Sequence, residues 1–310
     1  MSRGALRAGQ VLLAGALLAL LWHLAGGAEA LRNLTSADRG WLVAAVAALT
    51  LQTVLSALRW KLTAARLGIT LETREALREY YLAQVVNQSL PGGVIGDAGR
   101  AIRARGQAGL VASGQAVLFE RLAGQAGLFA VMAAAFIVTL ARPGGVTWPS
   151  WLIAPVGLFV LAGLFLPVCL SLAVRLPCRA GRALRAVWAP LVRSLVARDV
   201  IMRQAALSVG TTMCNLAAFG FCAQAVGHGL SPAAVVTFVP LILLTMLVPL
   251  TISGWGLREG AAAVLFPVAG ATASGGLAAS VAFGLTVIVA ALPGLGVLLA
   301  ARRGQAASLF

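Results

Sequence analysis

Two segments of the chain combine helix-breaking residues with an arginine in the same arrangement. The first runs from Pro91 to Arg100 and the second from Pro249 to Arg258, and in each Gly follows Pro by five positions and Arg by nine. A guanidinium binds phosphate or carboxylate oxygens bidentately, and clustered glycines can expose backbone amides that hold an anion. One such element in each half of a hydrophobic chain predicts a transporter site at a repeat interface.

The candidate substrate-binding residues lie in these two segments and in one neighbouring helix. They are Asn87, Pro91, Gly92, Gly93, Gly96, Asp97, Arg100, Glu120, Arg121, Pro249, Ser253, Gly254, Gly256, Arg258 and Glu259. No catalytic or metal-binding residue is expected.

The two acidic candidates of the first half need partners. An ionised group at membrane depth is costly, so Asp97 is expected to pair with Arg100, three residues later. Glu120 and Arg121 are adjacent and diverge on a helix, so Glu120 is expected to pair with Arg100 or Arg103. In the alternative interpretation, Arg100 belongs to a surface cluster with Arg103 and Arg105, and Glu120-Arg121 is an interfacial pair at the start of a span.

Composition identifies the elements that must position these residues. The chain of 310 residues is 60% hydrophobic and 11% charged, with a mean hydropathy of +0.93, which predicts an all-α polytopic membrane protein. Spans of about 20 apolar residues are expected at 9–28, 40–58, 122–141, 151–174, 204–226 and 277–300. Two broken, re-entrant elements are expected at 80–99 and 232–256.

The distribution of charge predicts the orientation. The net charge of +15 does not indicate nucleic-acid binding, because most basic residues, Arg59 among them, fall in segments on one side of the membrane. This is the positive-inside pattern, and it predicts a multi-pass protein of the bacterial inner membrane with both termini in the cytoplasm. The alternative for residues 9–28, a cleaved signal peptide, would leave an odd number of spans.

The chain divides near its middle, at the Pro- and Gly-containing loop 142–150. Each half contains two spans, a broken element and a third span. Three crossings are an odd number, so the second half must start on the opposite side from the first. A single membrane domain, 1–310, is therefore expected to hold two inverted repeats, 1–141 and 151–303.

These motifs resemble the lysylphosphatidylglycerol synthase transmembrane (flippase-like) family. The resemblance rests on Leu90-Pro91, Gly96-Asp97 and Arg100, and on Pro249, Gly254, Gly256 and Arg258-Glu259. The sequence departs from the family pattern at Ile95 and Ser253, where the family has Gly. The resemblance implies two re-entrant elements that meet near the membrane centre. The soluble aminoacyl-transferring domain of fused members has no counterpart, so synthesis of an aminoacylated lipid is not expected.

Together these features predict a lipid translocase for a phospholipid, aminoacylated lipid, glycolipid or polyprenyl-linked lipid. The four cysteines lack metal-ligand spacing, and no nucleotide-binding or nucleophile motif occurs, so neither enzymatic activity nor a cofactor is expected. Three alternatives remain open: a non-catalytic partner of a lipid or envelope biosynthesis enzyme, a small-molecule secondary transporter, and a lipid-phosphate transferase with Asp97 or Glu120 as base. The sequence does not indicate the oligomeric state.

Overall fold

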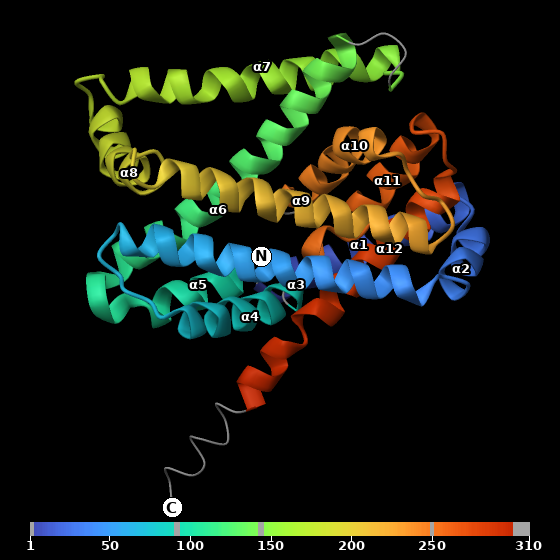
Figure 1. The fold of residues 1–310 in the computed structure, drawn as a ribbon, viewed down its shortest axis with the longest axis horizontal. Helices are drawn as coiled ribbons and strands as arrows, with labels where there is room; N and C mark the ends of the chain where they lie inside the picture. The colour runs from blue at the N-terminus through green and yellow to red at the C-terminus, as the bar shows by residue number, and fades with distance from the viewer. Residues whose placement is uncertain (1–2, 90–93, 142–145, 249–250, 300–310) are drawn as a thin grey trace, which may run out of the picture.

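The computed structural model describes residues 3–89, 94–141, 146–248 and 251–299 (Figure 1). Within these ranges the chain forms twelve α-helices and no strand, which confirms the all-α polytopic fold. The helices are α1 (Arg3–Leu24), α2 (Gly27–Thr35), α3 (Arg39–Ala65), α4 (Thr73–Ser89), α5 (Ile95–Arg103), α6 (Arg105–Ala141), α7 (Ser150–Ala173), α8 (Arg179–Leu195), α9 (Ile201–Ala225), α10 (Pro232–Leu244), α11 (Leu257–Val268) and α12 (Ala273–Ala291). Two short 3₁₀ turns, Thr245–Leu247 and Ile252–Gly254, follow α10.

Five of the described helices are long and apolar enough to cross a membrane, and a bent pair makes a sixth candidate. The five are α3, α6, α7, α9 and the stretch Ala273–Leu299 that contains α12. The bent pair is α1 with α2, which meet at an angle of 94°. The bend follows from Gly26, whose φ of 70° is a left-handed conformation that glycine adopts without steric cost.

The centre of the bundle is built from α3, α9 and α12. In Figure 1, α3 and α9 run side by side in opposite directions. Fully buried alanines on both helices, Ala45, Ala57 and Ala218, let the backbones approach closely, as small residues do in membrane bundles. Phenylalanines from α9, α10, α11 and α12 fill the adjoining core: Phe219, Phe238, Phe266 and Phe283.

Two helical hairpins, α4–α5 and α10–α11, pack on this centre from opposite ends of the molecule (Figure 1). The close packing of α4 on α5 depends on Gly96, where a Cβ would lie 2.1 Å from the carbonyl oxygen of Ala83. In the second hairpin the turn is made by Ser253, Gly254 and Gly256, with φ of 51°, 77° and 89°. These hairpins correspond to the broken elements predicted at 80–99 and 232–256, and α11 is the returning arm of the second.

The helix that carries Glu120 and Arg121 differs from the prediction. It begins at Arg105, and Gly109, with a φ of 81°, bends it near its start. Residues 122–141 are therefore only its second half. The interpretation of Glu120-Arg121 as an interfacial pair at a helix start is wrong, because both residues lie in the interior of α6 and Glu120 is fully buried.

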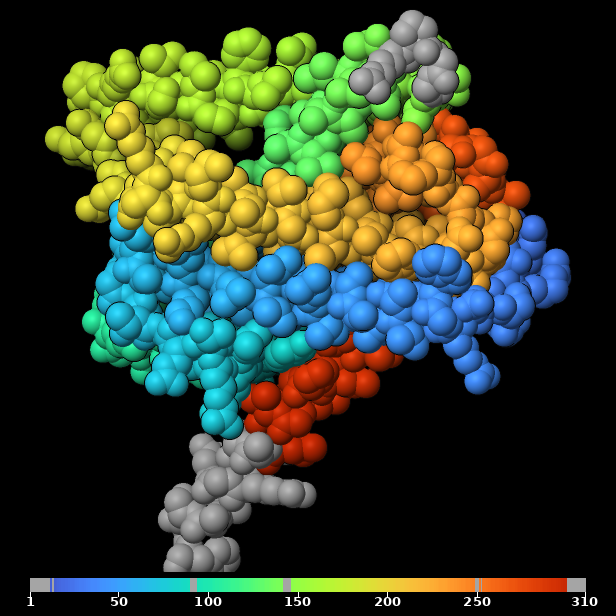
Figure 2. Space-filling model, viewed as in Figure 1, coloured from blue at the N-terminus to red at the C-terminus, as the bar shows by residue number. Residues whose placement is uncertain are grey.

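The helix α7 lies at the edge of the bundle. Figure 2 shows a hollow between α7 and α9 beside α6. Only 11% of the apolar stretch of α7 is buried against the rest of the protein. The chain then turns through α8, an additional helix at the same end of the molecule as the base of the first hairpin (Figure 1). Arginines 179, 182, 185 and 193 lie on or at the start of α8, so this end of the molecule is strongly basic.

Candidate functional site

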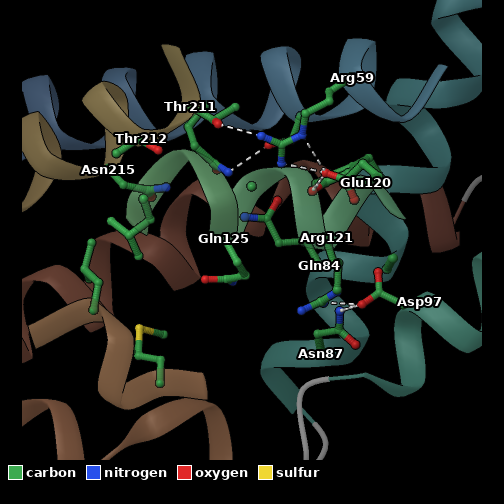
Figure 3. A pocket seen from close by; sticks show the side chains of 18 of the residues that line it. Arg59, Gln84, Asn87, Asp97, Glu120, Arg121, Gln125, Thr211, Thr212 and Asn215 are labelled. Carbon is green, nitrogen blue, oxygen red and sulfur yellow. Dashed lines mark hydrogen bonds and ion pairs between the residues drawn. The ribbon is translucent and has the colours of Figure 1, made fainter. Parts of the chain in front are cut away.

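A cavity of about 330 Å³ lies where α3, α4, α6 and α9 converge on the second hairpin (Figure 3). One part of its wall is polar and is supplied by charged, amide and hydroxyl side chains. The other part is apolar and comes from Leu128, Leu243, Met246 and Leu247. The polar lining residues are Gln52, Ser56, Arg59, Tyr80, Gln84, Asn87, Gln88, Asp97, Glu120, Arg121, Gln125, Thr211, Thr212, Asn215 and Ser253.

Glu120 is the centre of a buried ion cluster in the polar wall. Its Oε1 accepts hydrogen bonds from Arg59 Nη2 at 2.7 Å and Nε at 3.3 Å, and from the Tyr80 hydroxyl at 3.3 Å. Its Oε2 accepts from Arg100 Nη2 at 3.3 Å. Since a buried carboxylate is stable only when paired and hydrogen-bonded, these donors keep Glu120 in its charged form.

Arg100 stands behind the cavity wall and is 1% exposed. Its guanidinium lies 4.5 Å from the ring centres of both Trp60 and Tyr80, a cation–π arrangement on two faces. Its Nη2 also donates to Asp97 Oδ1 at 3.0 Å. The expected pairing of Arg100 with Asp97 is thus confirmed, as is the pairing of Glu120 with Arg100.

Asp97 connects the ion cluster to the turn of the first hairpin. Its Oδ2 accepts from Asn87 Nδ2 at 3.3 Å and is ion-paired with Arg121. Asn87 Oδ1 in turn accepts from the backbone N–H of Gly96 at 2.8 Å, which satisfies a donor at the start of α5 that has no partner within the helix. Arg121 has the most exposed charged group of the cluster, with 42% of its side chain accessible.

The second hairpin has its own buried cluster, away from the cavity. Arg258 donates to Glu259 Oε1 from Nη2 at 2.6 Å and to the Ser280 hydroxyl from Nε at 2.9 Å. Its guanidinium also lies over the rings of Trp255 and Phe283. Glu259 Oε2 accepts from the backbone N–H of Gly256 at 2.6 Å, so this carboxylate caps the start of α11.

Within the described residues, a side-chain hydrogen bond joins the end of α4 to the second hairpin. The hydroxyl of Ser253 donates to Gln88 Oε1 at 2.7 Å, which joins the second hairpin to the end of α4. The structure therefore brings Asn87, Asp97, Glu120, Arg121 and Ser253 to the cavity.

The other predicted site residues lie around the cavity or outside the described part of the chain. Gly96, Arg100 and Gly254 contact lining residues without lining the cavity themselves. Gly256, Arg258 and Glu259 belong to the separate cluster of the second hairpin. Those outside the described residues are Pro91, Gly92, Gly93 and Pro249.

The sequence analysis missed the contributions of α3 and α9. The interpretation of Arg59 as an ordinary cytoplasmic basic residue is wrong, because it is 4% exposed and pairs with Glu120. A signal was present: polar residues recur at helical spacing within apolar spans. On α3 these are Gln52, Ser56 and Arg59; on α9 they are Ser208, Thr211, Thr212 and Asn215. Such a stripe places every member on one helix face.

The chemistry of the cavity lining suits the binding of a ligand. Both carboxylates of the wall, Asp97 and Glu120, are paired with arginines. Ion pairing with arginine makes a carboxylate a poorer proton acceptor. Among the described residues there is no group of three His, Cys, Asp or Glu side chains that could hold a metal ion. A cavity lined by ionic and amide groups together with apolar side chains fits an amphiphile.

Comparison with known protein families gives one match. The model described as the lysylphosphatidylglycerol synthase TM region matches residues 8–294. No curated protein and no solved structure matched the chain.

Proposed function

The chain belongs to the lysylphosphatidylglycerol synthase TM family, and from that premise we propose that it is a translocase that moves lipid headgroups across the bacterial inner membrane without catalysing a reaction. Membership of the family indicates a membrane lipid-related function. The observation that carries the finer proposal is the mixed lining of the cavity, in which charged, amide and hydroxyl groups occur together with Leu128, Leu243, Met246 and Leu247. A headgroup would lie against the polar wall and its chains against the apolar one.

Two features support movement of the lipid past this site. The hairpins enter from opposite ends of the molecule. A headgroup bound between them would lie midway between the two sides of the membrane. Their turns are joined by the Ser253–Gln88 hydrogen bond, a contact whose net contribution is about 1 kcal/mol and which can open without unfolding a helix. With the basic end that holds α8 in the cytoplasm, the first hairpin enters from inside and the second from outside, and both termini are cytoplasmic.

Reconstitution of the purified protein tests the proposal. Vesicles would carry phosphatidylglycerol with a fluorescent acyl chain, and external dithionite would quench the label of the outer leaflet. Label of the inner leaflet becomes accessible only if the lipid crosses. We expect wild-type protein to expose it. The proposal is overturned if the inner-leaflet label of every anionic lipid tested stays protected in vesicles that contain the protein. That result would favour the alternative function, a non-catalytic partner of a biosynthetic enzyme.

A matched pair of arginine variants tests the site itself. Arg121→Gln removes a cavity guanidinium, whereas Arg103→Gln removes one that pairs with Glu79 at 2.5 Å outside the cavity. Hydrogen bonds to charged groups contribute about 1.5–3 kcal/mol, so we expect transport by Arg121→Gln to fall at least about tenfold and Arg103→Gln to match the wild type. Equal rates for the two variants would remove the cavity from the mechanism.

A further inference from the structure

We infer that the cavity selects an anionic headgroup rich in hydroxyls, a phosphate-linked polyol, and discriminates against headgroups that carry an amine. This inference rests on the proposed function and names the substrate class of the same site. It follows from the charge of the ion cluster, including Arg100 behind the wall, from the pairing of the cluster's carboxylates with arginines, and from the amide groups of the cavity.

The charged side chains of the cluster leave one positive charge in excess. Arg59, Arg100 and Arg121 face only two carboxylates, those of Asp97 and Glu120. An excess of positive charge among largely buried groups attracts an anion more strongly than the same charge on an open surface. Arg121 is the exposed member, and a guanidinium has five N–H donors, so it can bind a phosphate oxygen while it remains paired with Asp97.

All four oxygens of the two carboxylates already accept bonds. Glu120 uses both oxygens for arginines. Asp97 uses Oδ1 for Arg100 and Oδ2 for Asn87 and Arg121. No other acidic residue lines the cavity among the described residues. An ammonium group would therefore have to compete with a buried guanidinium for every carboxylate it could reach.

A quaternary ammonium group finds no aromatic site either. Such groups are recognised by the faces of several aromatic rings. Within the described lining, Tyr80 is the one aromatic residue, and Arg100 lies over its ring at 4.5 Å. The cavity thus provides neither a carboxylate nor a ring face for a choline, ethanolamine or lysyl headgroup.

The uncharged part of the polar wall favours hydroxyls. Five primary amides line the cavity in addition to Asn87: Gln52, Gln84, Gln88, Gln125 and Asn215. Each amide both donates and accepts, which matches a hydroxyl, also a donor and an acceptor. Oε1 of Gln125 is buried and accepts no hydrogen bond within the described residues. Unpaired buried acceptors are rare, and a headgroup hydroxyl would supply the missing donor after a small rotation of the side chain.

Transport of four acyl-labelled lipids in reconstituted vesicles tests the selectivity. We expect phosphatidylglycerol and phosphatidylinositol to cross, and phosphatidylethanolamine and phosphatidylcholine to cross at least about tenfold more slowly, because their cationic groups would lie beside the arginines of the cluster. Equal transport of all four would overturn the selectivity but leave the translocase proposal standing. Transport of none would overturn the translocase proposal itself.

A charge-changing variant tests whether the charge at the cavity selects the lipid. Gln125→Glu adds one negative charge to the cavity at constant shape and cancels the excess, whereas Gln115→Glu adds it on the same helix outside the cavity. We expect Gln125→Glu to slow phosphatidylglycerol about tenfold and to narrow its advantage over phosphatidylethanolamine, and Gln115→Glu to do neither. Unchanged selectivity in Gln125→Glu would show that the charge of the cavity does not choose the lipid.

Discussion

Removal of the Glu120 charge tests whether the buried ion cluster holds the bundle together. Glu120→Gln keeps the shape of the side chain but leaves Arg59 and Arg100 facing a neutral amide. The exposed pair Arg66–Asp199 is a natural control, because its Nη–Oδ distance of 2.7 Å equals the Nη–Oε distance of Arg59–Glu120. The two pairs differ in burial: the side chains are 5% and 1% exposed in the cluster and 37% and 62% exposed in the control.

The difference in burial sets the expected magnitudes. Breaking a buried pair by removing one partner costs about 3–5 kcal/mol, because the other charge stays buried. Arg100 retains Asp97 at 3.0 Å, so the lower end, about 3 kcal/mol, is expected for Glu120→Gln. An exposed pair contributes about 0–1 kcal/mol, and that range applies to Asp199→Asn.

Thermal unfolding in detergent measures the two effects. Intrinsic fluorescence of the seven tryptophans follows unfolding, and one of them, Trp60, lies against Arg100 in the cluster. At about 2 °C of Tm per kcal/mol for a chain of this size, Glu120→Gln should lower Tm by about 6 °C. Asp199→Asn should lower it by less than about 2 °C. Equal shifts for the two variants would refute the reasoning, since they would show that burial adds nothing to this pair.

Two further predictions concern packing and topology. Gly96→Ala should lower both Tm and transport, because its Cβ would meet the Ala83 carbonyl oxygen at 2.1 Å, whereas Gly106→Ala, with open space around its Cβ, should leave both unchanged; equal behaviour of the two would mean that α4 and α5 do not pack closely. In a variant without the exposed Cys169 and Cys178, an impermeant maleimide should label Arg78→Cys only from the cytoplasm and Ser231→Cys only from outside, and labelling of both from one face would exclude opposed hairpins.

The overall fold was predictable because apolar length and Pro/Gly breaks are local properties of the sequence. The bends were not. Gly26 and Gly109 both adopt left-handed φ values, of 70° and 81°, yet neither stands beside a proline, and glycine also occurs often inside straight membrane helices. A glycine therefore permits a bend without requiring one. Whether the chain bends at Gly26 depends on where α2 packs, and it packs on α12, which lies far away in the sequence.

The site was predictable only where its partners are close in the sequence. Asp97 and Arg100 are three residues apart on one helix, so their pairing follows from helical geometry. Arg59 and Glu120 are 61 residues apart, and Arg59 lies near the end of an apolar span, where a positive-inside residue is also expected. Charge counting cannot separate these two roles. The polar stripe that continues from Gln52 through Ser56 to Arg59 does separate them, because a residue that merely anchors a helix end needs no polar neighbours on its face.

The two motifs share their spacing but not their place in the returning helix. Gly96 lies within α5, whereas Gly254 lies in the 3₁₀ turn before α11. Arg100 is in the last turn of α5, whereas Arg258 is in the first turn of α11. What the two hairpins share is the way in which the start of the returning helix is capped.

The first N–H groups of each returning helix have no partner within the helix. In α5 the N–H of Gly96 donates to Asn87, and in α11 that of Gly256 donates to Glu259. An acidic residue in the first turn suits the positive end of the helix dipole, and the arginine beside it neutralises that charge. In the second hairpin, Arg258 pairs with Glu259, donates to Ser280 and lies over the ring of Trp255. In the first hairpin, Arg100 pairs with Glu120 as well as with Asp97, and Glu120 pairs in turn with Arg59. The ion pairs at the start of α5 therefore continue into the lining of the cavity, whereas those at the start of α11 do not.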